Sequence, residues 1–258
     1  MTQATRPLEQ QPRAIVIGAS SGIGAALVEG LAAAGYQVAA LARREARLQE
    51  LKARADRLAG APRVHIYPHS VTETDVIPAL FQQVVADLGG LDLIIYCAGV
   101  MPEVRPDEYD FAKDEQMVRV NLLGAMAWLN QAAIRFSRTG SGRIVGISSV
   151  SGDRGRRGMP AYHASKGGFS IYLESLRNRL THQGVSVTTI KPGFVDTEML
   201  ASATSGGKFW VISPEDAARQ IIQAAEKGKQ TVYIPRRWGL VMLIIRHIPS
   251  VIFRRLSF

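Results

Sequence analysis

A tyrosine and a lysine stand four positions apart in the stretch AYHASK, which covers residues 161–166. On a helix this spacing places the side chains of Tyr162 and Lys166 on one face. A free phenol titrates near pH 10, so a cation beside it is useful where the phenol must give up and regain a proton. The alternative is an ordinary Tyr/Lys pair on a helix surface. The rest of the chain has to decide between these two interpretations.

A glycine-rich turn is the second stretch that could do chemistry. Residues 13–18 form a short apolar run that predicts a buried strand, and helical spacing follows over residues 22–34. Glycines allow a tight turn and let a phosphate approach the backbone, and a helix N-terminus adds partial positive charge. This position predicts a dinucleotide site; the alternative is a turn with structural duties only. The predicted contacts are Gly18, Ser20, Ser21, Gly22, Ile23 and Gly24.

The end of the second predicted strand, residues 37–42, chooses between cofactors. An acidic residue there would accept hydrogen bonds from the adenosine ribose. The chain has Arg43 and Arg44 instead, and a guanidinium matches a 2′-phosphate in shape and charge. We expect NADP(H) to be favoured over NAD(H), with Arg43 as the first contact and Arg44 as the second. The alternative is that both arginines simply open a solvated helix.

Strands and helices alternate along the rest of the chain. Further strands are predicted at 64–67, 91–96, 143–147, 185–190 and 231–234, and helices at 45–58, 78–88, 121–138, 161–182 and 213–227. This alternation predicts one α/β domain with a parallel sheet covered on both faces. The expected organisation is a flexible lead over residues 1–12, a domain over 13–235 and an apolar, basic tail over 236–258.

Composition sets the limits for these interpretations. The chain has 258 residues, of which 47% are hydrophobic and 21% charged, as in ordinary folded proteins. Its single cysteine, Cys97, excludes an internal disulfide and fits a reducing compartment. The polar N-terminus does not resemble a signal peptide. The net charge is +9, but zinc-finger and aromatic RNA-binding patterns are absent, so we expect neither nucleic acid nor metal binding.

The motifs now assemble into a recognisable order. The chain resembles the short-chain dehydrogenase/reductase family from about residue 12 to 235, through GASSGIG at 18–24, CAG at 97–99, Asn121, Ser149, Tyr162 with Lys166, and KPG at 191–193 followed by Thr197. Each motif alone is weak, whereas the ordered set is specific. The resemblance implies a Rossmann-type doubly wound sheet and hydride transfer with a nicotinamide cofactor.

The resemblance also implies roles for single residues. Tyr162 would be the general acid or base at the substrate oxygen, and Lys166 would lower the pKa of the phenol and hold the nicotinamide ribose. Ser149 would hydrogen-bond the same substrate oxygen, and Asn121 would hold a water that links Lys166 to solvent. Further cofactor contacts implied by the family pattern are Ser70, Val71, Ala98, Gly99, Pro192, Gly193, Val195 and Thr197.

Two departures from the family pattern affect the cofactor side. The family often has two asparagines before Ala98, where this chain has Tyr96 and Cys97, so the contacts of those asparagines are lost. An aspartate usually follows the third strand, where this chain has Ser70. A serine can still accept a hydrogen bond from the adenine, so we expect a weaker grip rather than none.

The loop after Ser149 and the tail bear on the substrate. Arg154, Arg156 and Arg157 could bind a phosphate or carboxylate; the alternative is solvent-facing or intersubunit arginines. Residues 227–258 contain seven Lys or Arg and no Asp or Glu. The apolar run 240–245 is far too short to span a bilayer, for which about 20 residues are needed. The tail therefore suits either a membrane interface or packing on the domain or a second subunit.

The tail motifs RHIP and IFRR and the arginine loop are also similar to one branch of the family, which reduces a decaprenylphosphoryl 2-keto-pentose. The leading expectation is an NADP(H)-dependent carbonyl reductase or alcohol dehydrogenase in the cytoplasm. A reductase of a lipid-linked keto-sugar at the inner face of the membrane is the second, and a catalytically silent cofactor-binding scaffold is the third. The family implies a homodimer or homotetramer.

Overall fold

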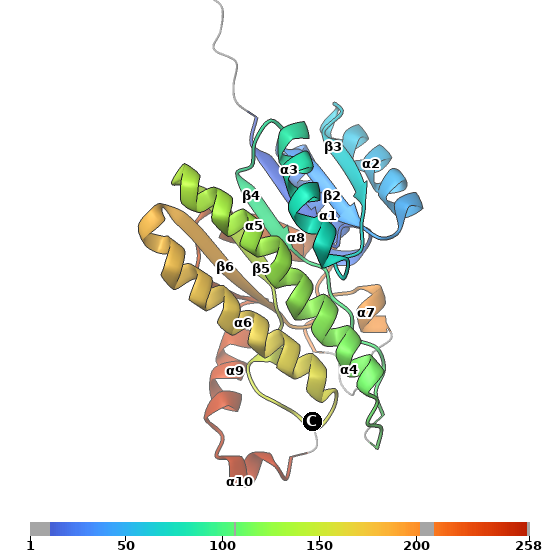
Figure 1. Cartoon of the computed structure of the whole chain (residues 1–258). Helices are drawn as coiled ribbons and strands as arrows, with labels where there is room; N and C mark the ends of the chain where they lie inside the picture. Colours follow the sequence, from blue (N-terminus) through green and yellow to red (C-terminus); the bar gives the residue numbers. More distant parts are fainter. Residues whose placement is uncertain (1–10, 106, 202–208, 257–258) are drawn as a thin grey trace, which may run out of the picture.

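Seven parallel strands form one sheet in the order β3-β2-β1-β4-β5-β6-β7 (Figure 1). The computed structural model describes residues 11–105, 107–201 and 209–256, so the predicted flexible lead at 1–12 lies almost entirely outside the described residues. The strands are β1 (Arg13–Ile17), β2 (Gln37–Ala42), β3 (Val64–Pro68), β4 (Leu93–Tyr96), β5 (Gly142–Ile147), β6 (Val185–Pro192) and β7 (Thr231–Ile234).

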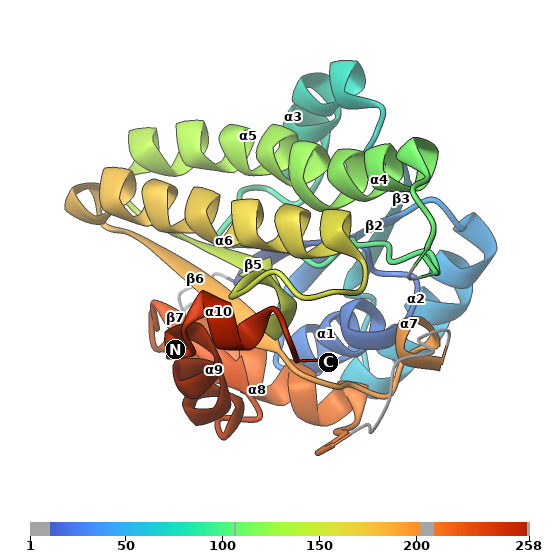
Figure 2. The same ribbon diagram turned by 90° about the horizontal axis from the view of Figure 1, so that it is seen from below.

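Helices cover both faces of the sheet, as Figure 2 shows in the view along its edge. One face carries α1 (Gly22–Ala33), α2 (Glu45–Ala59) and α8 (Pro214–Glu226); the other carries α3 (Ile77–Asp87), α4 (Phe111–Val118), α5 (Gly124–Thr139) and α6 (Pro160–Leu180). Each face buries its own apolar cluster. The predicted Rossmann-type α/β fold is therefore confirmed.

The strand order reverses at β1, which decides where a ligand can bind. In the sheet Ala14 of β1 pairs with Val38 on one side and with Leu93 on the other. The helices that precede these two neighbours lie on opposite faces of the sheet. The loops after β1 and β4 therefore run in different directions, which leaves a crevice at the carboxyl ends of the strands. The glycine turn and the CAG stretch border this crevice.

Element boundaries agree with the sequence prediction to within a residue or two, except around Asn121. The predicted helix 121–138 begins as α5 at Gly124, because residues Arg119–Leu123 form a π-helical turn. Before this turn lies α4, which was not predicted. Asp110 begins α4, since its carboxylate accepts hydrogen bonds from the N–H groups of Ala112 and Lys113. This capping aspartate was the available sequence signal.

Shorter elements complete the chain. They are the 3-10 turns Thr74–Val76, Val150–Gly152 and Thr181–Gln183, and the helices α7 (Glu198–Ala201), α9 (Trp238–His247) and α10 (Ser250–Phe253). Both α9 and α10 belong to the tail. The inner side of α9 buries Trp238 and Met242 against Val150. Within the described part of the chain, no helix is long and apolar enough to cross a membrane.

Candidate active site

A cavity of about 870 Å³ lies at the carboxyl ends of the central strands and gathers most of the predicted site residues. It runs from the glycine turn before α1 to the start of α6. The predicted residues that line it are Gly18, Ser20, Ser21, Gly22, Ile23, Gly24, Arg43, Arg44, Ser70, Val71, Ala98, Gly99, Ser149, Arg156, Arg157, Tyr162, Lys166, Pro192, Gly193, Val195 and Thr197. Asn121 and Arg154 lie outside its lining.

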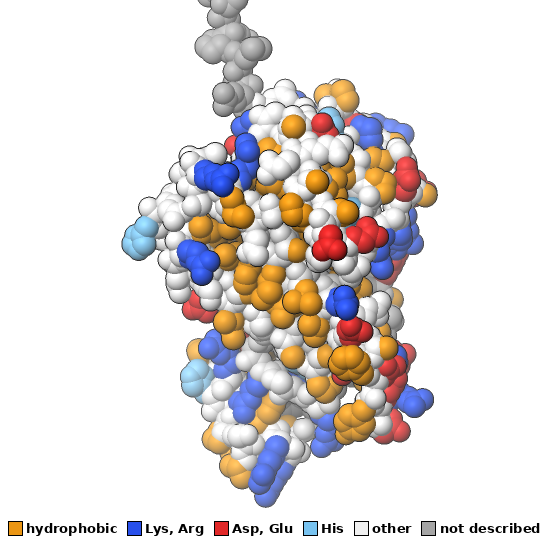
Figure 3. Space-filling model, viewed as in Figure 1, with side chains coloured by type: hydrophobic (Ala, Val, Ile, Leu, Met, Phe, Trp, Pro, Cys, Tyr) orange, Lys and Arg blue, Asp and Glu red, His pale blue; other side chains and the backbone are white. Residues whose placement is uncertain are grey.

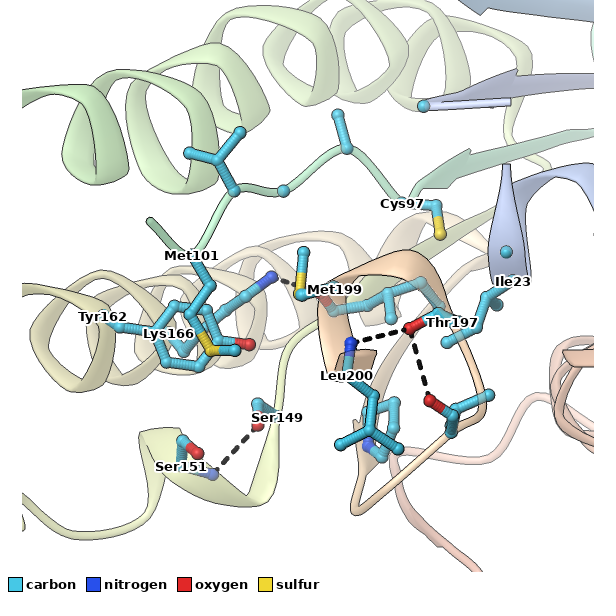
Figure 4. A pocket seen from close by; sticks show the side chains of 18 of the residues that line it. Ile23, Cys97, Met101, Ser149, Ser151, Tyr162, Lys166, Thr197, Met199 and Leu200 are labelled. Atoms are coloured by element: carbon cyan, nitrogen blue, oxygen red, sulfur yellow. Dashed lines mark hydrogen bonds between the residues drawn. The ribbon is translucent and has the colours of Figure 1, made fainter. Parts of the chain in front are cut away.

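The first turns of α6 bring Tyr162 and Lys166 to the cavity on one helix face. Both side chains are buried, with 7% and 4% of the residue surface exposed, so the alternative of an exposed surface pair is wrong. Ser149 follows β5, and its Oγ accepts a hydrogen bond from the N–H of Ser151 at 3.0 Å. Figure 4 shows the Tyr162 ring and the Ser149 side chain reaching towards the same space.

Two groups oppose the effect of burial on the pKa of the Tyr162 phenol. Burial raises its pKa above the ordinary value of 10.0, whereas a hydrogen bond with the Ser149 side chain and the charge of Arg156 lower it. The Arg156 guanidinium is held in place because Nη2 donates to the Ser151 hydroxyl at 2.7 Å. Arg156 was assigned to substrate binding from the sequence. In the structure the charge of Arg156 also lowers the pKa of the Tyr162 phenol.

Lys166 lies further from the phenol than the helix spacing suggests. Its Nζ is 6.0 Å from the centroid of the Tyr162 ring and donates to the carbonyl oxygen of Ile147 at 3.0 Å. Burial lowers its pKa from 10.5 to about 8, so the ammonium can release a proton near neutral pH. An ammonium has three donors, and among the described residues only the Ile147 carbonyl accepts from it, which leaves the other donors for a ligand in the cavity.

Asn121 is fully buried at the π-helical turn between α4 and α5. Its Oδ1 accepts from the N–H of Val100 at 2.8 Å, and its Nδ2 donates to the Val100 carbonyl at 3.0 Å and to the Ser165 hydroxyl at 3.2 Å. A π turn adds a residue to the helix and redirects the side chain there. Asn121 thus ties the loop after β4 to α6, which carries Tyr162.

The glycine turn has the backbone shape that a phosphate requires. Gly18 has a φ of +90°, and a Cβ there would lie 2.4 Å from the N atom of Ala98, so only glycine fits. The turn leads into α1, which starts at Gly22 and whose first N–H groups have no partner within the helix. Together with the free donors of Lys166, this donor set fits a dinucleotide bound along the cavity.

The two arginines after β2 differ in their surroundings. Arg43 is exposed and lines the cavity. The guanidinium of Arg44 donates to the hydroxyls of Ser20 and Ser21 at 2.8–3.1 Å and forms an ion pair with Glu198 at 3.3 Å. A 2′-phosphate would therefore bind Arg43 more readily than Arg44, because Arg44 already bonds Ser20, Ser21 and Glu198.

The departures from the family pattern have local explanations. Tyr96 replaces an asparagine, and its buried hydroxyl donates to the carbonyl oxygen of Val120 at 2.6 Å. It therefore joins β4 to the π-helical turn by a bond that the sequence alone did not reveal. Ser70 lines the cavity, and its hydroxyl lies 2.9 Å from that of Thr72, so it remains a polar group on the adenine side.

The prediction that Arg154 binds the substrate needs a correction. Its Nη1 donates to the backbone carbonyls of Ile245 and Ile248 at 2.6 Å each, and its guanidinium stacks on the Phe253 ring at 3.9 Å. Its donors thus hold the tail rather than a substrate. Arg156 and Arg157, from the same loop, do line the cavity.

Next to Arg154, the buried carboxylate of Asp153 joins three parts of the chain. It accepts hydrogen bonds from Lys191 at the end of β6 and from the Tyr233 hydroxyl of β7, the latter at 2.7 Å. The loop after β5 is therefore fixed to the last two strands on one side and to the tail on the other.

Much of the cavity wall was not predicted. Large apolar side chains in it include Met101, Met199, Leu200, Phe209, Trp238 and Ile245. They come from loops, from α7 and from α9, which are far apart in the sequence and carry no recognisable motif. Figure 4 shows Met101 next to Tyr162 and Met199 near Lys166. Among the described residues, no group of three or more acidic, His or Cys side chains could hold a metal ion.

Comparison with known proteins gives consistent results. A family model described as short chain dehydrogenase matches residues 12–207. An uncharacterized oxidoreductase of Myxococcus xanthus is 32% identical over 93% of this chain and 94% of its own length. An uncharacterized oxidoreductase of Mycobacterium tuberculosis is 29% identical over 94% of this chain and 96% of its own length.

Solved structures share the fold. A short-chain type dehydrogenase/reductase from Mycobacterium ulcerans superposes with a TM-score of 0.80 at 23% identity, over 95% of this chain and 98% of its own. The NADP-bound structure of ElxO gives a TM-score of 0.76 at 20% identity, over 87% and 97%.

Proposed function

The chain belongs to the short chain dehydrogenase family, whose members are NAD(P)-dependent oxidoreductases, and from this we propose that it reduces a carbonyl compound with NADPH. Tyr162 acts as the general acid, or as the base in the reverse direction. The observation that carries the proposal is that the Ser149 and Tyr162 side chains reach towards the same space in a cavity that also contains the glycine turn and Lys166.

A nicotinamide bound in the cavity would supply the hydride, and the side chains of the protein act on the substrate oxygen and the proton. The hydroxyl of Ser149 and the phenol of Tyr162 hydrogen-bond the carbonyl oxygen, which orients it and stabilises the negative charge that develops there. Tyr162 then gives its proton to this oxygen. Acid catalysis by a positioned group contributes roughly 10² to 10⁴ in rate.

Lys166 replaces the proton that Tyr162 loses. Its lowered pKa of about 8 supports this role, since the ammonium holds a proton at neutral pH and releases it easily. The family pattern suggests that a water near Asn121 completes the path to solvent. A second duty of Lys166 is to donate hydrogen bonds to the ribose of the cofactor.

NADP(H) is the preferred cofactor in this proposal because Arg43 follows β2, at the position where an acidic residue would favour NAD(H). The exposed Arg43 side chain supports this, and a guanidinium recognises phosphate through paired hydrogen bonds. The bound NADP of ElxO belongs to a protein of the same fold and is in line with the proposal. Arg43→Asp should shift the ratio of kcat/KM values from NADPH towards NADH, whereas Arg57→Asp, on the exposed side of the helix α2 that follows Arg43, should not. An unchanged ratio in the first variant would disprove the phosphate contact.

The central experiment removes the proton donor. Tyr162→Phe keeps the ring and loses the hydroxyl, so turnover should fall by at least about 10² while NADPH binding, measured by the quenching of tryptophan fluorescence, stays near wild type. Ser149→Ala should lower kcat by a similar factor. If Tyr162→Phe retains full turnover with a ketone that the wild type reduces, the assigned mechanism is wrong. Wild-type protein that binds NADPH but oxidises none with any ketone would favour the silent scaffold.

A second candidate substrate is a lipid-linked keto-sugar phosphate. It is favoured by the combination of Arg156 and Arg157 with apolar walls such as Phe209 and Trp238 around one cavity. A phosphate would bind the arginines, and an apolar chain would lie along the walls. Comparing an anionic ketone with its uncharged ester tests this: Arg157→Gln should raise the KM for the anion only. Equal KM changes for both ketones would remove the anion-binding role.

A further inference from the structure

The helix α9 has two apolar faces, of which the domain covers only one. Trp238 and Met242 on the inner face are 8% and 1% exposed. On the outer face Leu240, Leu243 and Ile244 are 66%, 54% and 60% exposed. These three positions follow the i, i+3, i+4 spacing of a continuous helical stripe. Large apolar side chains gathered in this way indicate an interaction site rather than chance exposure.

The apolar surface continues beyond α9. In α10 the side chains of Val251 and Ile252 are 54% and 52% exposed. The guanidinium of Arg154 bonds the carbonyls at the end of α9 and stacks on Phe253 of α10, which fixes the two helices next to each other at one end of the molecule (Figures 1 and 2). We call the exposed residues of α9 and α10, with the arginines among them, the tail surface.

The charge of the tail surface has one sign. Residues 236–258 contain five arginines and no acidic residue, and all five arginines are exposed. They are Arg236, Arg237, Arg246, Arg254 and Arg255. Figure 3 shows blue and orange side chains intermingled over this end of the molecule. Exposed aliphatic side chains between arginines match an anionic lipid interface, which takes up the apolar groups and attracts the cations.

The tail surface adjoins the mouth of the active-site cavity. Trp238 and Ile245 of α9 line the cavity, while their neighbours in the helix face outward. Exposed Phe209 also lines the cavity, and the next residue, Trp210, contacts both the Trp238 ring, at 5.6 Å, and the Arg237 guanidinium, at 4.7 Å. Any surface that covers α9 therefore lies next to the cavity.

We propose that the tail surface docks the protein on an anionic lipid bilayer, with α9 and α10 lying in the headgroup region and the cavity next to the membrane. The binding is interfacial: the aliphatic side chains enter the boundary of the acyl chains, and the arginines contact the lipid phosphates. This inference does not depend on the reaction, because docking requires only the tail surface. It would give the cavity direct access to substrates dissolved in the membrane.

A second copy of the chain is the competing occupant. In a two-fold symmetric contact the same patch faces itself, so a dimer through the tail surface would bring two sets of five arginines together. No acidic residue of the segment 236–258 could neutralise them. Charge complementarity therefore favours lipid over a second tail.

Vesicle flotation tests the proposal. The full chain is mixed with vesicles of phosphatidylcholine containing phosphatidylglycerol, and separately with pure phosphatidylcholine vesicles. Wild-type protein should float with the anionic vesicles and bind the neutral ones far more weakly. Leu243→Glu with Ile244→Glu should weaken binding at least about tenfold, and Arg254→Gln with Arg255→Gln should weaken it roughly 30-fold at low salt.

A matched variant controls for the added charge. Leu58→Glu with Ile171→Glu changes two side chains that are 65% and 67% exposed on α2 and α6, and flotation should drop far less than in the tail variant. Reduction of a water-soluble ketone should be equal in all these proteins, which separates loss of docking from loss of the catalytic site. Wild-type binding that is equal for both vesicle types, or that survives Leu243→Glu with Ile244→Glu, overturns the proposal. So does a wild-type oligomer that does not bind vesicles and dissociates in this tail variant, since the occupant is then a second copy.

Discussion

Replacing Arg156 by glutamine removes the charge that acts on the catalytic phenol and keeps a side chain that can still hydrogen-bond Ser151. Burial raises the pKa of Tyr162, and the Ser149 hydrogen bond and the Arg156 charge lower it. Without the guanidinium, only Ser149 opposes burial. The pKa of Tyr162 should therefore rise further in Arg156→Gln.

The size of the effect follows from the charge and its surroundings. An opposite charge near an acid lowers the pKa of that acid. Arg156 lines an open cavity and is partly exposed, so solvent weakens its charge. We therefore expect a change in rate at the lower end of what such a charge causes, about tenfold.

Oxidation of a secondary alcohol with NADP⁺ is the right assay, because Tyr162 must then act as a base and be deprotonated. The profile of kcat/KM against pH should move to higher pH, and below the pKa the rate should be about tenfold lower than in wild type. Arg156→Lys, which keeps the charge, should restore most of the profile. Arg157→Gln changes a cavity arginine that is not among the charges acting on Tyr162, so its profile should stay at the wild-type position.

Two results would refute this reasoning. If Arg156→Gln raises KM but leaves the pH profile in place, Arg156 binds substrate and does not tune the phenol. If Arg157→Gln shifts the profile by the same amount, the effect comes from the general potential of the loop rather than from the placement of Arg156.

Other predictions concern the parts that hold the site together. Asp153→Asn should lower the free energy of unfolding by about 3–5 kcal/mol in urea denaturation, since the Asp153 side chain is only 1% exposed. Asp216→Asn, in an exposed pair, should cost less than about 1 kcal/mol. Gly193→Ala should cost about 1–3 kcal/mol and alter tryptophan fluorescence, because a Cβ there would lie 2.0 Å from the indole at the start of α9; Gly155→Ala, in open space, should change neither. Asn121→Ala leaves the N–H and the carbonyl of Val100, in the loop after β4, without their partner and should cost about 1–3 kcal/mol. The fall in kcat should be larger than any change in NADPH binding; stability and kcat equal to wild type would contradict its role.

The sequence determined the fold and the order of the site residues. Strands such as residues 14–17 are continuous apolar runs, which only a sheet buried on both faces explains, and helices alternate with them. In such a sheet the carboxyl ends of neighbouring strands meet at one edge. Gly18, Ser149 and Gly193 each follow a strand, so their convergence could be inferred without coordinates.

Local sequence patterns predicted the structure less well where two helices follow each other without a break. The helix that begins at Phe111 was missed although Asp110 is a good N-cap, because the π-helical turn at Asn121 shifts the apolar periodicity. A periodic pattern cannot reveal a bulge whose stability comes from tertiary partners such as Val100 and Tyr96.

Only the tertiary structure separated the three arginines of one short loop. Arg154 holds the tail, Arg156 acts on Tyr162, and Arg157 lines the cavity. They share one residue type within four positions, and the difference lies in what each guanidinium meets across the fold. The same holds for the tail: the sequence showed that it is apolar and basic, but the sides of α9 that face the domain and the solvent depend on contacts with distant residues such as Val150. Residue types and spacing thus determined which groups come together, whereas the charges and contacts between groups distant in the chain were decided by packing.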